Sequence, residues 1–233
     1  GADLGAEKFL DIKCRMAGLR PDAVVVVATV RALKMHGGLD KKSLGTEDLA
    51  ALERGIPNLL RHVSNIKNVY RLPCVVAVNR FPTDTDAEIG CVIERCKELG
   101  VNVRLSTVWA DGGRGGEELA REVVRLCETP SDFTFSYDLD GTIEDKIEAV
   151  VRRVYGGAGI SVAAPAKKEI DRLTALGFDR LPVCIAKTQY SFTDDPTVPG
   201  APEGFTVTVR GVKVSAGAGF LVVLTGEIMT MPG

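Results

Sequence analysis

The chain has 233 residues, of which 45% are hydrophobic and 26% charged, and its formal net charge is −2 at pH 7. This length and apolar content suffice for a buried core in one large or two smaller domains. The near-neutral charge argues against nucleic acid as a partner, and no apolar run is long enough to span a membrane.

The first part of the chain alternates apolar strands with amphipathic helices. Thr83 and Asp84 are predicted to cap the third of these helices. Continuous apolar strands between helices are typical of a parallel α/β sheet, which binds its ligands at the carboxyl ends of the strands. The expected helices are residues 6–18, 47–66, 86–99 and 117–127, and the expected strands are residues 23–30, 72–81 and 101–109.

The character of the sequence changes after Pro130. The segments expected beyond it are a short strand at 134–139, a helix capped by Asp140 or Thr142 and closed by Gly156 and Gly157, a helix at 165–176, a strand at 180–186, and an antiparallel pair made by 205–215 and 219–227. We therefore predict two regions. Residues 1–130 form a parallel β/α region, and residues 131–233 form a smaller mixed α+β region with closing antiparallel strands.

The six cysteines lie within apolar periodic segments, without CxxC pairs. Such cysteines are typical of the reduced core thiols of a cytoplasmic protein. His36 and His62 are the only histidines and are far apart in sequence, so no metal site is expected.

The only tryptophan, Trp109, ends a predicted strand and precedes a glycine-rich run made of Gly112, Gly113, Gly115 and Gly116. Such a run suits a phosphate cradle, a plain strand-to-helix turn, or a loop cleared of side chains beside a flat ligand. Glu117 and Glu118 would occupy the first turn of the next helix and repel a phosphate, which disfavours the cradle. We favour a flat ligand stacked on Trp109, with the plain turn as the alternative.

Phe81 occupies an equivalent place after the preceding strand. If the two strands are neighbours in a parallel sheet, Phe81 and Trp109 emerge at the same edge and form the two sides of a slot. The alternative is that Phe81 packs under its loop as part of the core.

Cationic residues follow the first strand in VATVRALKMHGG, residues 27–38. Arg31, Lys34 and His36 there are candidates to contact an anionic substrate, and solvated loop residues are the alternative. Lys187 is a further candidate, because it begins a dense polar run after the strand at 180–186.

The segment VATVRALKMHGG resembles a signature of the formate–tetrahydrofolate ligases. Further segments resemble the same family in the same order: GADLGAEKF, AVNRFPTDTDAEI, VWADGGRGGEELA, LPVCIAKTQYSFTDDP, GAPEGFTVTVR and SAGAGFLVVLTGEIMTMPG. The resemblance implies ATP-dependent ligation of formate to tetrahydrofolate through formyl phosphate, giving 10-formyltetrahydrofolate in one-carbon metabolism. It also implies a P-loop-type α/β core with additional domains, a homotetramer, ATP with Mg²⁺ as co-substrate, and a monovalent cation.

Carried over by position, the resemblance implies that Phe81 and Trp109 sandwich the pterin ring and that Ala6 lies near the adenine. The GxxxxGK[ST] phosphate loop of the family is absent from this sequence. The chain also begins inside a helix entry and stops directly after a strand. We therefore expect it to be the folate-side portion of a longer enzyme.

This portion is expected to have no catalytic residue or covalently bound cofactor of its own and to be inactive alone. Its partners would be tetrahydrofolate, formate, ATP and the N-terminal half of the enzyme. The alternatives are a non-catalytic folate- or nucleotide-binding module and a half that serves oligomerisation.

Overall fold

The computed structural model describes residues 5–226, which divide into two compact units. The central unit comprises Arg20–Thr134 and Pro199–Ala201, and the terminal unit comprises the remaining described residues. The expected boundary near residue 130 lies close to this division. Residues 5–19, however, group with the terminal unit, although the prediction placed them in the first region with residues 20–130. The ranges 1–4 and 227–233, which are the two ends of the predicted regions, lie outside the described residues.

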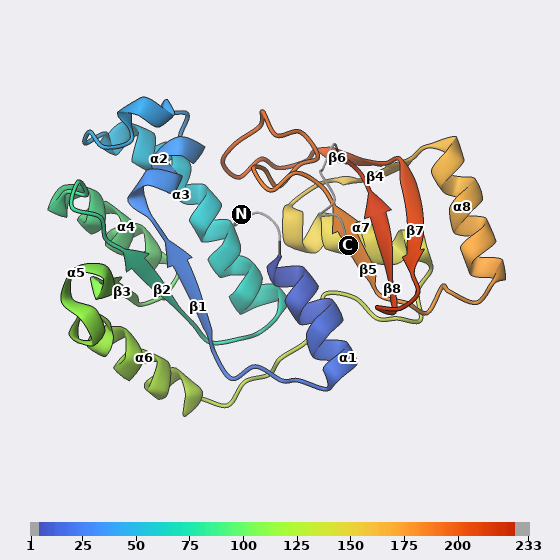
Figure 1. Cartoon of the computed structure of the whole chain (residues 1–233), viewed down its shortest axis with the longest axis horizontal. Helices are drawn as coiled ribbons and strands as arrows, with labels where there is room; N and C mark the ends of the chain where they lie inside the picture. The colour runs from blue at the N-terminus through green and yellow to red at the C-terminus, as the bar shows by residue number, and fades with distance from the viewer. Residues whose placement is uncertain (1–4, 227–233) are drawn as a thin grey trace. The chain divides into compact units, whose positions relative to one another are not determined.

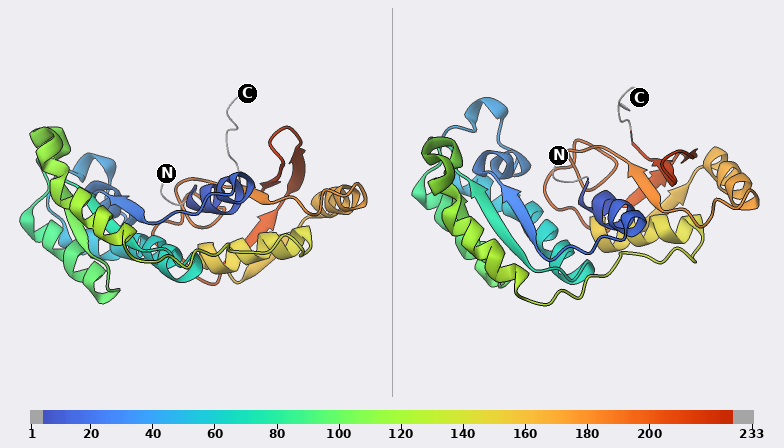
Figure 2. Two further views of the ribbon diagram at one scale, coloured as in Figure 1. Left: turned by 90° about the horizontal axis from the view of Figure 1, so that it is seen from below. Right: turned by 60° about the horizontal axis from the view of Figure 1, so that its bottom comes forward.

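The central unit is built on a parallel sheet of three strands in the order β1-β2-β3, as Figure 1 shows. Figure 2 shows these strands side by side in two further views. The prediction of an α/β fold with parallel strands is confirmed. In chain order the elements are β1 (Val24–Ala28), α2 (Val30–His36), η2 (Lys41–Ser43), α3 (Leu49–Ser64), η3 (Asn65–Val69), β2 (Cys74–Asn79), α4 (Asp86–Glu98), β3 (Val103–Ser106), α5 (Val108–Asp111), η4 (Gly112–Gly116) and α6 (Glu117–Cys127).

The segment after β1 is the helix α2, where the sequence predicted a strand running into a polar loop. Thr29 caps it, because its hydroxyl oxygen accepts a hydrogen bond from the backbone nitrogen of Ala32 at 3.2 Å. The residues that follow the cap include several strong helix formers. Helix α2 also packs closely on α3, since a Cβ on Gly55 would lie only 1.7 Å from the carbonyl oxygen of Leu33.

A buried ion pair joins α2, α3 and α4. Lys34 Nζ lies 2.7 Å from Glu88 Oε1, and both side chains are fully buried. The same oxygen accepts from the backbone nitrogen of Asp48, which caps α3, at 3.2 Å. The other oxygen accepts from the nitrogen of Thr85, which caps α4, at 3.1 Å. One carboxylate therefore fixes the starts of two helices and the side of a third.

The pKa of Glu88 reflects these contacts. Burial alone would raise it, but the hydrogen bonds from Lys34, Thr85 and Asp48 outweigh burial and hold the pKa below its ordinary value. The carboxylate is therefore ionised in the folded chain at neutral pH.

The terminal unit contains two small sheets. β4 pairs with β6 in parallel, while β8 pairs with β5 in parallel and with β7 in antiparallel orientation. The predicted antiparallel pair is confirmed as β7 and β8, but β6 belongs to the other sheet. The elements are η1 (Lys8–Cys14), α1 (Arg15–Ala17), α7 (Ile143–Val150), η5 (Val151–Tyr155), β4 (Gly159–Val162), α8 (Ala164–Ala175), β5 (Val183–Ala186), β6 (Thr206–Val209), β7 (Gly211–Ser215) and β8 (Phe220–Leu224).

Residues 5–19 join the terminal unit through polar contacts with the segment after residue 134. The Asp11 carboxylate accepts from the backbone nitrogen and the hydroxyl of Ser136 at 2.8 and 2.7 Å. Arg15 donates to the carbonyl oxygen of Tyr137 at 2.6 Å. The strand predicted at 134–139 is not formed, because the nitrogen of Ser136 bonds to a side chain instead of a strand ladder. Of the two predicted caps, Thr142 caps α7.

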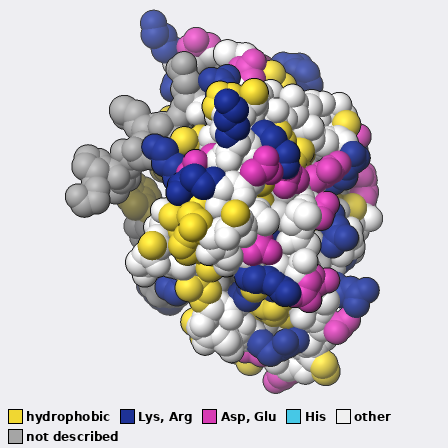
Figure 3. Space-filling view, turned by 90° about the vertical axis from the view of Figure 1, so that its right-hand side faces the viewer, with side chains coloured by type: hydrophobic (Ala, Val, Ile, Leu, Met, Phe, Trp, Pro, Cys, Tyr) yellow, Lys and Arg dark blue, Asp and Glu magenta, His cyan; other side chains and the backbone are white. Residues whose placement is uncertain are grey.

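Basic and acidic side chains are interspersed on the face drawn in Figure 3. In the terminal unit, Lys167 of α8 pairs with both Glu144 and Asp171 at 2.8 Å. Within residues 5–226, every helix is too short or too polar to cross a membrane.

We expect removal of one partner of the Lys34–Glu88 pair to destabilise the chain more than neutralisation of both. Lys34→Met leaves a carboxylate buried without its cation and should lower the free energy of unfolding by about 3–5 kcal/mol. In Lys34→Met/Glu88→Gln no buried charge remains, and the amide oxygen can still accept from the nitrogen of one of the two helix caps. Urea unfolding should therefore find the double variant more stable than Lys34→Met.

The acid limb of the stability profile tests the same pair. The pKa of Glu88 is lower in the folded chain than in the unfolded chain, so ionisation of this carboxyl stabilises the fold at any pH above the unfolded pKa. This stabilisation is lost as the pH falls through the folded pKa. Glu88→Gln should therefore lose less stability on acidification than the wild type. The coupling would be contradicted if the double variant lost as much stability as the two single variants together. It would also be contradicted if Glu88→Gln lost as much stability on acidification as the wild type.

Candidate functional site

Two aromatic side chains emerge at one edge of the central sheet. Strands β2 and β3 run parallel with Asn79 opposite Ser106, and the nitrogen of Arg80 donates to the carbonyl oxygen of Ser106 at 3.1 Å. Phe81 comes directly after this contact, and Trp109 lies in the short helix α5 after β3. The carboxyl ends of neighbouring strands thus bring the two aromatics together.

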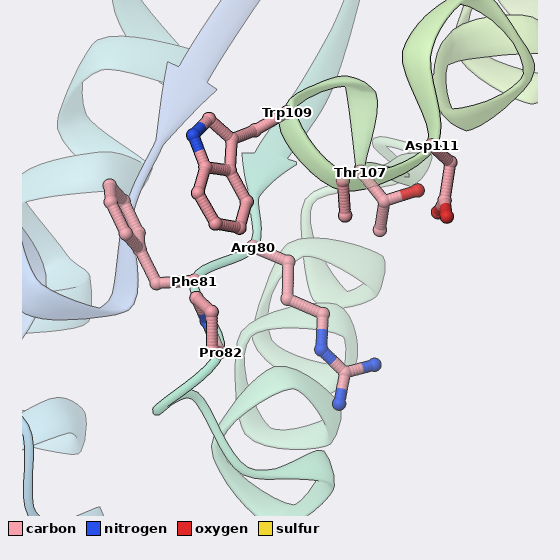
Figure 4. Close-up of a pocket in the computed structure, with 7 residues that line it drawn as sticks. Arg80, Phe81, Pro82, Thr107, Trp109 and Asp111 are labelled. Atoms are coloured by element: carbon pink, nitrogen blue, oxygen red, sulfur yellow. The ribbon is translucent and has the colours of Figure 1, made fainter.

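A pocket of about 330 Å³ lies at this edge and is lined by Arg80, Phe81, Pro82, Thr107, Trp109, Ala110 and Asp111. Figure 4 shows the ring of Phe81 and the indole of Trp109 projecting toward a shared space, while the guanidinium of Arg80 points away from them. The side chain of Trp109 is open to solvent, with 81% of its residue surface exposed. This volume is at the lower end of ligand pockets and suits a flat bicyclic ring.

Phe81 is held in a tight turn by Asp84. The backbone nitrogen of Asp84 donates to the carbonyl oxygen of Phe81 at 2.9 Å, and Asp84 Oδ2 accepts from the nitrogen of Phe81 at 2.8 Å. The predicted cap of α4 at Thr83 or Asp84 is therefore wrong, because Asp84 closes this turn and Thr85 caps the helix. Within the described residues, the buried Oδ1 of Asp84 has no hydrogen-bond partner.

The glycine run forms a tight strand-to-helix turn, the alternative given above, and does not itself clear space in the pocket. None of Gly112, Gly113, Gly115 and Gly116 lines the pocket. The carbonyl oxygen of Gly115 accepts from the nitrogen of Thr107 at 3.0 Å, and a Cβ on Gly115 would lie 2.5 Å from the carbonyl carbon of Thr107. Gly112 has a φ of 60°, which disfavours a side chain. The glycines let the chain fold back tightly on Thr107, and this turn presents Trp109.

The three cationic candidates after β1, which are Arg31, Lys34 and His36, all lie on α2 but have different surroundings. Lys34 is buried against Glu88 and is not accessible to a substrate, so this candidate is wrong. His36 Nδ1 accepts from the backbone nitrogen of Gly200 at 3.1 Å. Only Arg31 reaches the aromatic edge, where its guanidinium carbon lies 4.7 Å from the ring centroid of Phe81.

The candidates Lys187 and Ala6 belong to the terminal unit. Lys187 is fully buried, donates to the carbonyl oxygens of Thr188 and Ser191, and lies 4.8 Å from the ring centroid of Tyr155. Ala6 is exposed. Neither residue lines the pocket of the central unit.

Sequence reasoning missed the polar lining of the pocket, although each polar residue lies within two positions of a predicted aromatic. Thr107 and Asp111 add a hydroxyl and a carboxylate to the lining, whereas the guanidinium of Arg80 points away from the rings and pairs with Asp86 at 2.9 Å. Between residues 5 and 226, no group of three or more His, Cys, Asp or Glu side chains could hold a metal ion. The arrangement is therefore suited to binding a flat ring with polar edges.

Comparison with known protein families gives a match along the whole chain. Residues 1–233 match the family model described as formate–tetrahydrofolate ligase. The match includes the segments that carry Phe81 and Trp109.

We expect Gly115→Ala to displace the turn that presents Trp109, because the new methyl group would overlap the backbone of Thr107. The free energy of unfolding should fall by about 1–3 kcal/mol, the usual cost of overpacking. The emission of Trp109, the only tryptophan, should change as well. Urea unfolding and fluorescence spectra measure both effects.

Gly113→Ala is the matched control, since a Cβ there meets nothing within 4 Å. Equal behaviour of the two variants would show that the close contact at Gly115 does not shape the turn.

Proposed function

This chain belongs to the formate–tetrahydrofolate ligase family, and from that premise we propose that its pocket holds the pterin ring of tetrahydrofolate between Phe81 and Trp109. The family catalyses ATP-dependent ligation of formate to tetrahydrofolate in one-carbon metabolism. The observation that supports the assignment is the position of both aromatics at the carboxyl ends of neighbouring parallel strands, lining one pocket.

The size and lining of the pocket agree with this ligand. A pterin is a flat bicyclic ring, and stacking on an aromatic face contributes about 0.5–1.5 kcal/mol beyond the area buried. The ring edge carries amide-like donors and acceptors, which Thr107 and Asp111 can complement. With Trp109 exposed, the tail of the folate can extend into solvent.

In the proposed reaction, formate and ATP give formyl phosphate and ADP. The N10 nitrogen of tetrahydrofolate then attacks the formyl carbon, phosphate leaves, N10 gives up its proton to the departing phosphate or to water, and 10-formyltetrahydrofolate forms. The contribution of this chain is to hold the pterin so that N10 meets the formyl carbon. Rate enhancement from such positioning needs no side-chain base in the pocket.

ATP and Mg²⁺ do not fit the residues at hand. The sequence has no GxxxxGK[ST] segment, and the described residues bring no three metal-ligating side chains together. We assign the phosphates and Mg²⁺ to an N-terminal half of the enzyme and keep Ala6 as the candidate near the adenine. The family resemblance supports a cytoplasmic homotetramer with a monovalent cation, and the free thiols of all six cysteines agree with that compartment.

The alternatives are a non-catalytic folate- or nucleotide-binding module and an oligomerisation half whose aromatics are buried in an interface. The exposure of Trp109 in the single chain is compatible with either a ligand or an interface. Ligand binding and its dependence on Trp109 separate these possibilities.

In the complete enzyme, Trp109→Ala should weaken tetrahydrofolate binding by about 1–3 kcal/mol, the loss found when bases stack on aromatic side chains. Binding of ATP and formate should change little, because neither contacts this side of the pocket. Titration of each substrate measures the three affinities. Val124→Ala, at an exposed valine of α6, is the control. Equal losses for all three substrates would mean that Trp109 supports the fold instead.

The 233-residue chain alone should show no ATP-dependent ligation, because the groups that stabilise charge on a transferred phosphoryl would be absent. The measurement is formation of 10-formyltetrahydrofolate with saturating formate, ATP and tetrahydrofolate. Turnover above the blank would refute the assignment of the phosphate site to another part of the enzyme.

A further inference from the structure

Arg31 contacts the aromatic edge without lining the pocket. Its guanidinium carbon lies 4.7 Å from the ring centroid of Phe81, and Nη2 donates to the hydroxyl oxygen of Thr83 at 3.1 Å. Thr83 belongs to the same turn as Phe81, which Asp84 closes. Arg31 therefore contacts both the ring and the backbone turn that carries it.

Local stability does not account for an arginine at this position. Arg31 lies in the first turn of α2, where the helix dipole disfavours a cation. Its Nε is buried and, among the residues that the structure describes, has no hydrogen-bond partner. An unsatisfied buried donor and a cation at the wrong helix end both cost stability. Such violations of local rules are typical of functional sites.

Arg31 and the pocket lie on opposite sides of Phe81 in the order of the strands. Arg31 follows β1, Phe81 follows β2 and Trp109 follows β3, and the sheet order is β1-β2-β3. Phe81 thus stands between a cation from one neighbouring strand and an indole from the other. Because Arg31 is not among the lining residues, the pocket meets Phe81 on a part of the ring that Arg31 does not cover.

We propose that Arg31 is a positioning residue that acts through Phe81 and makes the pocket selective for the reduced, electron-rich pterin over the oxidised ring. This inference rests on the proposed folate site. A guanidinium over an aromatic face is attracted to its π electrons and draws their density toward itself. The opposite side of the Phe81 ring then becomes less negative and stacks better on an electron-rich partner. Tetrahydropterin is such a partner, whereas the oxidised pterin ring is electron-poor.

Binding to the 233-residue chain tests the proposal directly, because its single tryptophan reports on the pocket. Tetrahydrofolate under anaerobic reducing conditions and folic acid are titrated separately, and the fluorescence of Trp109 is corrected for ligand absorption. Arg31→Met should weaken tetrahydrofolate binding about five-fold and folic acid binding less than two-fold, as expected for loss of one cation–π contact. Arg31→Lys keeps the charge and should restore part of the selectivity, and it replaces the first variant if that one does not fold.

Two controls make the result specific. Arg95→Met removes an exposed charge on a different helix, α4, and should leave both affinities unchanged. In a Phe81→Leu background, Arg31→Met should have no further effect on either ligand, because no ring remains to transmit the charge. Equal weakening of both ligands, or an undiminished effect in the Phe81→Leu background, would overturn the role of Arg31. Absence of tetrahydrofolate binding by the wild-type chain would overturn the folate site itself, and this inference with it.

Discussion

The geometry of the central unit depends on one buried carboxylate. Glu88 accepts hydrogen bonds from Lys34, from the residue that caps α3 and from the residue that caps α4. A charge without a partner in this position would be costly, so an arrangement of the three helices that supplies these donors is favoured. Since α2 follows β1 and α4 follows β2, the constraint reaches both loops at the carboxyl edge of the sheet.

The two aromatic residues of the pocket are carried by short turns. The turn after β2 is closed by Asp84, and the turn after β3 is closed by the contact of Gly115 with Thr107. Both turns are tight because backbone groups bond within them, which leaves the aromatic rings projecting from short, well-fixed loops. A site that works by stacking and positioning needs this rigidity more than it needs a catalytic base.

The sequence allowed prediction of those features that depend on local pattern. Phe81 and Trp109 each follow an apolar strand, and the pairing of β2 with β3 was enough to bring them to one edge. Features that depend on distant polar partners could not be predicted. Lys34 appeared to be a substrate contact because Glu88 lies 54 residues further along the chain.

The N-terminal helix and the glycine run show the same limit. Residues 5–19 appeared to open the parallel region, since Asp11 and its partner Ser136 are 125 residues apart. The sequence pattern at Gly115 favours space cleared for a ligand, because its close contact with the backbone of Thr107 is a property of the folded turn. In each case the residue type was informative, but its partner was fixed only by tertiary structure.

Helix α2 links the stability of the central unit to its pocket. Arg31 and Lys34 lie three positions apart on this seven-residue helix, and their surroundings differ. Lys34 is fully buried and paired, whereas Arg31 is partly exposed and has an unpartnered Nε. The Lys34–Glu88 pair holds the helix from which Arg31 extends, and the hydrogen bond to Thr83 holds its guanidinium beside Phe81. The helix that the buried pair ties to α3 and α4 is thus the one that holds, against the aromatic edge, a guanidinium whose Nε has no hydrogen-bond partner within residues 5–226.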